Sequence, residues 1–348
     1  GIYIIRDPRN IVTSLAHHYQ VDENEAFEFM KDEKRALIEK VNDRFLGFVP
    51  ILSWALHQDS WIKCTKFPIL TIRYEDLQHE TFKTFVETIK FINKLSKCGF
   101  KKIETSSFVS PKWVPQLSDA FEVFNQITRT EGVKYTALTP NERGFDNAFE
   151  AKVDEVAIFT AGSETFNKKN TNCDIDTSLK RFKPIMRKAL INKIPVRGYI
   201  SCITHCPYEN YVNPKKVAEI ANKLIEMGCY EVSLGDTTGK GSPDKTLSVI
   251  NECMIFLTPN KLAGHFHDTY QNALNNIKIC LEKGIRTFDS SVGGLGGCPY
   301  SPGAKGNVDT EKVNSLLLSM GYETNLNISK IRKCSEIALN LKTRGSYE

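Results

Sequence analysis

Short apolar runs alternate with amphipathic stretches along most of the chain after about residue 100. Each run is rich in β-branched or aromatic residues and ends in polar ones, and an interval of helical periodicity follows it. The runs predict strands at 102–107, 133–139, 155–160, 196–201, 230–234, 262–267 and 286–291. The amphipathic stretches predict helices at 118–130, 177–193, 214–227, 243–257, 270–283 and 309–320. Repeated strand–helix units of this length indicate a parallel sheet covered by helices.

Polar side chains recur where these predicted strands end toward their carboxyl side. They are Glu104, Arg197, Asp236, His265 and His267. The carboxyl face of a (β/α)8 barrel carries the active site, so the clustering favours an α/β fold of the TIM-barrel type over an open sheet. The pattern yields seven strands where a closed barrel needs eight. We therefore expect a TIM-type barrel whose first strand is missing or replaced.

The first 75 or so residues follow a different pattern. They predict a strand at 2–5, a charge-rich helical stretch at 24–46 and a helix around 50–63. A further strand is predicted at 67–77. Because the regular alternation begins only afterwards, we expect two domains, a small α/β fragment followed by the barrel, with the bounds 1–76 and 77–348.

Composition excludes several classes of function. The net charge of the 348-residue chain is +5 and is spread without a Lys/Arg block, so we expect no nucleic-acid partner. No apolar run is long enough to span a bilayer and the first residues do not form a signal peptide, so we expect no membrane partner and a cytoplasmic location. The ten cysteines lack a framework spacing, which indicates reduced thiols.

Two segments of the C-terminal third carry candidate chemistry. The segment GHFHDTY at 264–270 puts His265 and His267 on one face of a strand. In SSVGGLGGCPYSPGAKGN, a glycine-rich loop carries Cys298 and is followed by Asn307. Two imidazoles and an amide oxygen suit a divalent cation, and a thiol on a flexible loop suits proton transfer. The structural alternatives are that the two histidines form a polar patch at a strand end and that Cys298 is a buried thiol.

From about residue 83 to residue 348 the chain resembles the 3-hydroxy-3-methylglutaryl-coenzyme A (HMG-CoA) lyases. Besides the His and Cys segments, the matching runs are IETSSFVSPKWVPQ, VRGYISC and CYEVSLGDT. The resemblance implies metal-dependent cleavage of the substrate HMG-CoA to acetyl-CoA and acetoacetate. It also implies a homodimer and, in a eukaryote, a mitochondrial matrix location.

The resemblance assigns roles to individual side chains. It implies that His265, His267 and Asn307 hold Mg2+ or Mn2+. The implied catalytic residues are Cys298 as the acid, His265, Asp236 and Glu104, and the implied substrate contacts are Arg197, Ser107 and Ser233. A helix cap for Asp236 and a structural ion pair for Glu104 or Arg197 are the alternatives.

Residues 1–76, which contain the segment RDPRNIVTSL at 6–15, resemble a truncated fragment of the sulfotransferases that use the sulfate donor PAPS. In that family Arg6 and Ser14 would bind the 3′-phosphate of the donor nucleotide. A guanidinium and a hydroxyl at a helix start make a reasonable anion site. The loop that would hold the 5′-phosphosulfate is missing, so we expect the nucleotide site to be vestigial.

The junction between the two parts departs from the lyase pattern. Lyases of this family begin with a strand that ends in Arg-Asp-Gly-Leu-Gln-Asn-Glu, whereas residues 72–80 read IRYEDLQHE. We expect residues 67–73 to replace the first strand, with Arg73, Glu75 or Asp76 as imperfect substitutes and with impaired turnover. The alternatives are a catalytically dead chimera, a sulfotransferase, or a condensing relative such as an isopropylmalate or homocitrate synthase.

Overall fold

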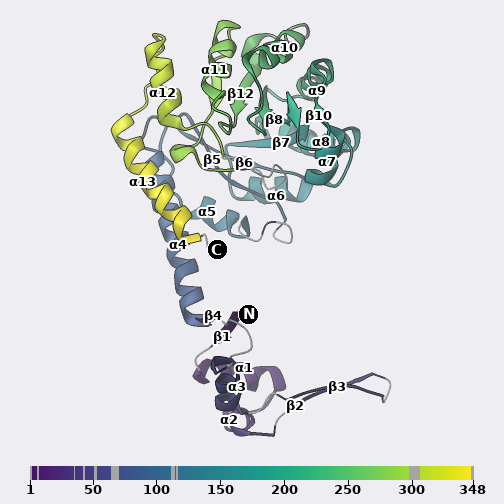
Figure 1. The fold of residues 1–348 in the computed structure, drawn as a ribbon, viewed down its shortest axis with the longest axis vertical. Helices are drawn as coiled ribbons and strands as arrows, with labels where there is room; N and C mark the ends of the chain where they lie inside the picture. Colours follow the sequence, from purple (N-terminus) through teal and green to yellow (C-terminus); the bar gives the residue numbers. More distant parts are fainter. Residues whose placement is uncertain are drawn as a thin grey trace. The chain divides into compact units, whose positions relative to one another are not determined.

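The computed structural model of the chain describes residues 2–5, 8–34, 36–41, 44–50, 53–63, 70–110, 114, 117–297 and 306–345. The chain divides into two compact units, Gly1–Glu87 and Thr88–Glu348. Figure 1 shows the helices and strands of each unit.

Seven parallel strands form the sheet of the second unit. Their order is β13-β12-β11-β8-β7-β6-β5, so strands that follow one another along the barrel part of the chain are also neighbours in the sheet. The strands are β5 (Lys102–Ser107), β6 (Lys134–Leu138), β7 (Glu155–Ala161), β8 (Val196–Ser201), β11 (Glu231–Asp236), β12 (Leu262–Phe266) and β13 (Thr287–Asp289). This curled sheet is the arrangement of a TIM-barrel-type fold, and all seven predicted strands are confirmed.

Helices follow these strands along the chain and lie on the outside of the sheet (Figure 1), and the last two of them come after the final strand. They are α5 (Ala120–Gln126), α6 (Glu142–Glu150), α7 (Glu164–Thr171), α8 (Ile175–Asn192), α9 (Pro214–Glu226), α10 (Pro243–Cys253), α11 (Ala273–Glu282), α12 (Thr310–Ser319) and α13 (Ile328–Gly345). The minor elements are β9 (His205–Cys206), β10 (Asn210–Tyr211) and the 3-10 turns Pro259–Lys261 and Val292–Gly294. The six predicted helices are confirmed, whereas α6, α7 and α13 were not predicted.

The two faces of the sheet differ in chemistry. Ile158, Ile200 and Leu234 are buried, and the register places Ile200 opposite Leu234 on one face. The Leu224 side chain of α9 lies 3.0 Å from the position that a Cβ on Gly198 would take, so this face packs against helices. Side chains alternate along a strand, and the residues between these point to the inside of the curl.

The first unit contains two small sheets and helices. A parallel pair joins β1 (Ile2–Ile5) and β4 (Leu70–Arg73), and an antiparallel hairpin joins β2 (Ala36–Val41) and β3 (Arg44–Pro50). The helices are α1 (Pro8–Tyr19), α2 (Glu23–Lys31), α3 (Trp54–Ile62) and α4 (Tyr74–Leu95), the last of which extends into the second unit. The strand at 2–5 and the helix around 50–63 are confirmed.

Two predictions for the first unit are wrong. The stretch 24–46 is helical only at α2, and it continues into the hairpin, because ALIEKV and RFLGFVP are rich in β-branched and aromatic residues. The strand predicted at 67–77 ends at Arg73, and the chain is helical from Tyr74. Residues 67–69 lie outside the described residues.

The predicted replacement of the first barrel strand is also wrong. Strand β4 pairs in register with β1, Leu70 opposite Ile2, and is not a member of the seven-stranded sheet. Pairing with β1 satisfies main-chain groups of β4 within the first unit. Glu75 and Asp76 begin α4 instead of extending a strand.

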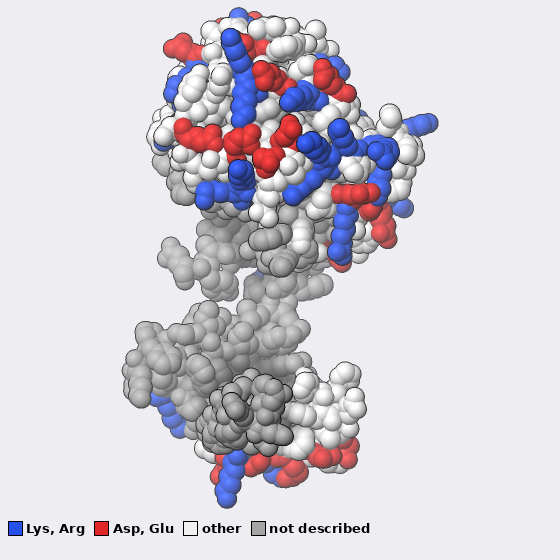
Figure 2. All heavy atoms as spheres, turned by 90° about the vertical axis from the view of Figure 1, so that its right-hand side faces the viewer, with Lys and Arg blue, Asp and Glu red and all other residues white. Residues whose placement is uncertain are grey.

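Charges of both signs lie side by side on the face that Figure 2 shows. Ion pairs join neighbouring helices, for example Lys216 of α9 and Glu164 of α7 at 3.2 Å. This mixing gives the drawn face no single-sign field for a polyanion. In the part of the chain that the structure describes, no helix is long and apolar enough to cross a bilayer, and each cysteine is a free thiol.

Replacing Ile158 by Ala tests the core between sheet and helices. Ile158 is 0% exposed on the central strand β7, so we expect the free energy of unfolding to fall by about 2–5 kcal/mol in urea denaturation. Ile191→Ala is the matched control, because Ile191 is 73% exposed on α8. We expect it to change stability by no more than about 0.5 kcal/mol. Equal losses in the two variants would contradict this packing.

Candidate active site

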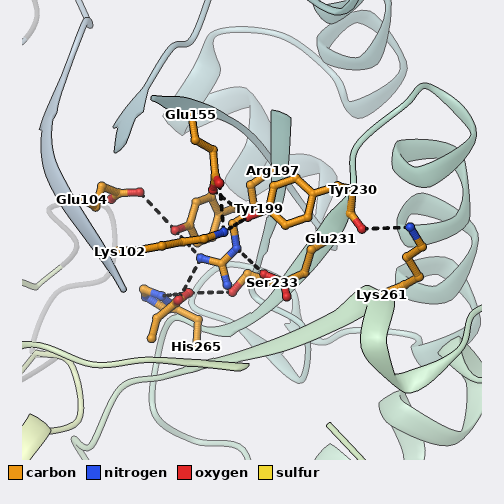
Figure 3. A network of polar contacts seen from close by, with 11 residues as sticks. Lys102, Glu104, Glu155, Arg197, Tyr199, Tyr230, Glu231, Ser233, Lys261 and His265 are labelled. Atoms are coloured by element: carbon orange, nitrogen blue, oxygen red, sulfur yellow. Dashed lines mark hydrogen bonds and ion pairs between the residues drawn. The ribbon is translucent and has the colours of Figure 1, made fainter. Parts of the chain in front are cut away.

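A buried arginine lies at the centre of the polar inner face of the sheet. The Nε of Arg197 donates to Glu231 Oε1 at 2.8 Å, and its Nη1 donates to Asp289 Oδ1 at 2.8 Å. The same Nη1 donates to the hydroxyl of Tyr199 at 2.7 Å (Figure 3). Arg197 is the second residue of β8, so its predicted position at the carboxyl end of the strand is wrong. Its long side chain reaches Asp289, the last residue of β13.

Asp289 joins four strands through one carboxylate. Its Oδ1 accepts from Arg197, while its Oδ2 accepts from Ser233 Oγ at 2.8 Å and lies 3.2 Å from His265 Nδ1. Burial raises the pKa of Asp289, but the charge of Arg197 and the contact with His265 outweigh it and hold the pKa well below its usual range. Asp289 was not among the candidate residues, although it directly precedes the segment SSVGGLGGCPYSPGAKGN that carries Cys298.

One donor of Arg197 has no partner within the described residues. Its Nη2 is buried and unbonded, while the residue as a whole is 6% exposed. Buried N–H groups are normally satisfied, so this atom is suited to bind an anionic or carbonyl oxygen of a ligand. The guanidinium is thus held by its protein partners on two nitrogens and available on the third.

Glu104 approaches this cluster from β5. Its Oε2 accepts from the hydroxyl of Tyr199 at 3.1 Å, so its contact with Arg197 runs through Tyr199 (Figure 3). Desolvation by the surrounding protein raises the pKa of Glu104, and the negative charge of Asp289 raises it further, although the residue keeps an exposed surface. Such a carboxyl group is suited to exchange protons nearer neutral pH.

The two histidines and Asn307 lie together at the end of β12. The rings of His265 and His267 have centroids 5.7 Å apart, and His267 forms an antiparallel bridge with Asn307. The two side-chain hydrogen bonds that Asn307 makes to described residues are donated by its Nδ2, to Leu295 O at 3.1 Å and Gly296 O at 3.2 Å. The Oδ1 of Asn307, the atom that would ligate a cation, takes no part in them.

This group of donors fits a divalent cation in part. The Nδ1 of His267 is buried and has no partner among the residues that the structure describes. Burial lowers the pKa of His267 to about 4, so the ring is neutral and able to ligate. Two imidazoles and an amide oxygen are then available. Among the described residues no three His, Cys, Asp or Glu side chains converge as a metal site, so no carboxylate there joins the two imidazoles.

Glycines shape the approach to Asn307. Gly296 has a φ of +91°, and a Cβ at this position would lie 2.8 Å from Asn307 Nδ2. Gly306, with a φ of +119°, is similarly crowded by Gly294 O at 2.7 Å. Cys298 lies outside the described residues. On one side of it along the chain Gly296 contacts Asn307, and on the other side Gly306 directly precedes Asn307.

The remaining candidates occupy different positions. Asp236 ends β11 and is buried; it accepts from Thr204 Oγ1 at 3.0 Å and from Gly241 N at 2.8 Å. Its register partner is Phe266, so Asp236 and His265 face opposite sides of the sheet. The capping residue of α10 is Ser242, and Asp236 holds the turn before it.

Ser233 is buried and bonded to Asp289, which leaves it inside the cluster. Ser107 is the last residue of β5 and has Leu138 as its register partner. Ser14 is exposed on α1, and Arg6 lies outside the described residues. The structure therefore brings together Glu104, Arg197, Ser233 and His265, with His267 and Asn307 adjacent to them.

A TIM-barrel-type sheet that carries a polar cluster at its inner face and strand ends is typical of barrel enzymes. Residues 77–338 match the HMGL-like family model, and the chain belongs to this family. It is 49% identical over 243 residues to the hydroxymethylglutaryl-CoA lyase of Pseudomonas mevalonii, covering 70% of this chain and 81% of that protein. It is 47% identical to the mitochondrial lyase of Bos taurus, covering 77% of this chain and 84% of the relative.

Solved structures agree with these relatives. The HMG-CoA lyase of Brucella melitensis superposes with a TM-score of 0.73 at 47% identity, over 74% of this chain and 92% of that one. The family match begins at residue 77, so the resemblance of residues 1–76 to sulfotransferases stays a prediction.

The lowered pKa of His267 predicts a dependence of stability on pH. Between pH 6.5 and about 4 the unfolded chain binds a proton at this residue that the folded chain does not. In metal-free buffer we therefore expect stability to fall as the pH falls through this window, with a contribution on the order of 3 kcal/mol from His267. Urea denaturation at pH 7 and pH 4 measures the loss.

His267→Gln is the control for this measurement, because glutamine does not titrate. The variant is expected to lose less stability than the unmodified chain between the two pH values, whatever its stability at pH 7. Identical losses in both proteins would show that His267 is protonated in the folded state.

Proposed function

We propose that the chain cleaves HMG-CoA to acetyl-CoA and acetoacetate. The observation that carries the proposal is the guanidinium of Arg197, which is bonded to Asp289 beside His265 and has one unbonded nitrogen. The chain that holds it is 45–49% identical to proteins named as HMG-CoA lyases. The relatives give no support to a condensing synthase or a sulfotransferase.

The reaction needs three operations on the substrate. A base removes the proton of the tertiary hydroxyl, the neighbouring carbon–carbon bond breaks, and its electron pair becomes the enolate of the acetyl thioester. An acid then protonates the enolate carbon. The free Nη2 of Arg197 supports a role in binding the thioester or enolate oxygen, where a preorganised donor stabilises developing charge.

Proton transfer is assigned to side chains that surround this position. His265 uses Nδ1 for Asp289, so its Nε2 is the nitrogen available for the hydroxyl proton or for ligation. The raised pKa of Glu104 supports a second proton-accepting role. Cys298 is the proposed acid, an assignment that follows the family resemblance. Asp236 is proposed to act through the turn at Gly241, which it holds at the mouth.

Mg2+ or Mn2+ would be held by His265, His267 and Asn307. When bound, the cation would acidify and orient the substrate hydroxyl. Ser107 and Ser233 remain proposed contacts of the substrate. A homodimer, and a cytoplasmic or mitochondrial location, are likewise proposals; relatives are named as mitochondrial in Bos taurus and cytoplasmic in Mus musculus.

Acetoacetate release from HMG-CoA with added magnesium tests the function. We expect turnover that depends on enzyme concentration, and about a hundredfold or more below that of the Pseudomonas mevalonii relative, since the first-strand Arg-Asp pair is displaced and lost charge stabilisation costs this much. Cys298→Ala is expected to abolish the remaining turnover.

Cys173→Ala is the matched control, because Cys173 lies at the turn between α7 and α8, and this variant should keep the activity. No product at any enzyme concentration would support the catalytically dead chimera. Equal rates for the chain and for Cys298→Ala would refute the acid role of the thiol.

A further inference from the structure

Asp289 contacts His265 from a position that is itself firmly held. In the parallel pairing of β12 and β13, His265 and Asp289 are register partners, so their side chains leave the same face of the sheet. The other contacts of the carboxylate, with Arg197 and Ser233, come from β8 and β11. Three strands therefore fix the direction of the oxygen that meets His265.

The contact selects one tautomer of the imidazole. An ionised carboxylate only accepts hydrogen bonds, so a neutral His265 bonded to Asp289 must carry its proton on Nδ1. Its Nε2 then has a free lone pair. The other tautomer would set the Nδ1 lone pair against the carboxylate oxygen, which is repulsive.

The ring is also held from a second side. Tyr199 packs edge-on against His265, with ring centroids 5.9 Å apart and planes at 83°. Tyr199 in turn accepts a hydrogen bond from Arg197, the guanidinium that binds Asp289. Rotation of the imidazole about its χ2 bond would break the Asp289 contact and lose the edge-on packing with Tyr199.

We propose that Asp289 is a positioning residue that holds His265 as its Nδ1–H tautomer, with Nε2 presented as a base or a metal ligand. The inference deepens the proposed lyase function and rests on it. A histidine that ligates a cation commonly donates its other ring N–H to a carboxylate, and loss of that partner typically weakens metal binding 10–100-fold.

The first test reads the tautomer directly. In a 15N-histidine NMR spectrum of the metal-free full chain at pH 8, we expect His265 to show the Nδ1–H pattern, assigned by its loss in His265→Gln. Asp289→Asn should convert it to the Nε2–H pattern, because the amide keeps its oxygen toward Arg197 and turns its N–H donors to Ser233 and His265. An Nε2–H pattern in the unmodified chain would overturn the proposal, even if no variant folds.

The second test measures the binding of Mn2+ alone by calorimetry. We expect Asp289→Asn to weaken it 10–100-fold. Glu231→Gln is the matched control, since Glu231 is the other carboxylate partner of Arg197, at the same 2.8 Å, and among the described residues its side chain bonds to Arg197 alone. We expect this variant to change Mn2+ affinity less than about twofold, while both variants raise KM for HMG-CoA through Arg197.

Equal weakening of Mn2+ binding in the two variants would mean that Asp289 acts by neutralising Arg197, and unchanged affinity in Asp289→Asn would mean that it does not position His265. Either result overturns the proposal. Both measurements omit HMG-CoA, so they stay decisive if the chain releases no acetoacetate, and failure of the proposed function is distinguished from failure of this inference.

Discussion

The ion pair between Arg197 and Asp289 is the interaction on which the polar interior of the sheet depends. A charge taken from water into a protein is costly unless it is paired and hydrogen-bonded. Arg197, at 6% exposure, meets this condition through Asp289, Glu231 and Tyr199. Barrels of this type usually fill their interior with branched apolar side chains. Here the outer face has that composition at Ile158, Ile200 and Leu234, whereas charged and polar side chains surround Arg197 on the inner face.

The alternating pattern of the sequence predicted the sheet well for a physical reason. Each strand pairs with the next along the chain, and each carries an apolar face that must be buried, so local periodicity and global topology agree. Helix α7 was missed because ETFNKKNT is short and largely polar, whereas α6, ERGFDNAFE, has a clear apolar face but is only nine residues long. The histidine pair was found because two imidazoles on one face of a strand are unusual, whereas the role of Asn307, far along the chain from them, followed from the family resemblance.

The missed and misplaced features depend on pairing in space. Asp289 is 24 residues from His265 and 92 from Arg197, and only the parallel register brings them together. Likewise, the apolar character of residues 70–73 identifies a strand but not its partner. Strand β1 has a similar apolar run and takes that role within the first unit. Propensity states which segments are extended, whereas partner choice depends on what else lies within reach.

The charges on the two edge strands of the sheet restrict which side chains a further strand could place between them. Within the described residues β5 and β13 have one neighbour each, and they carry Glu104 and Asp289, whose negative charges influence one another. A strand pairing with both would set its inward side chains between two carboxyl groups. A cationic side chain there would be stabilised by both, whereas an acidic one would be repelled. The two carboxyl groups therefore favour a basic over an acidic side chain at this position of any strand that completes the sheet.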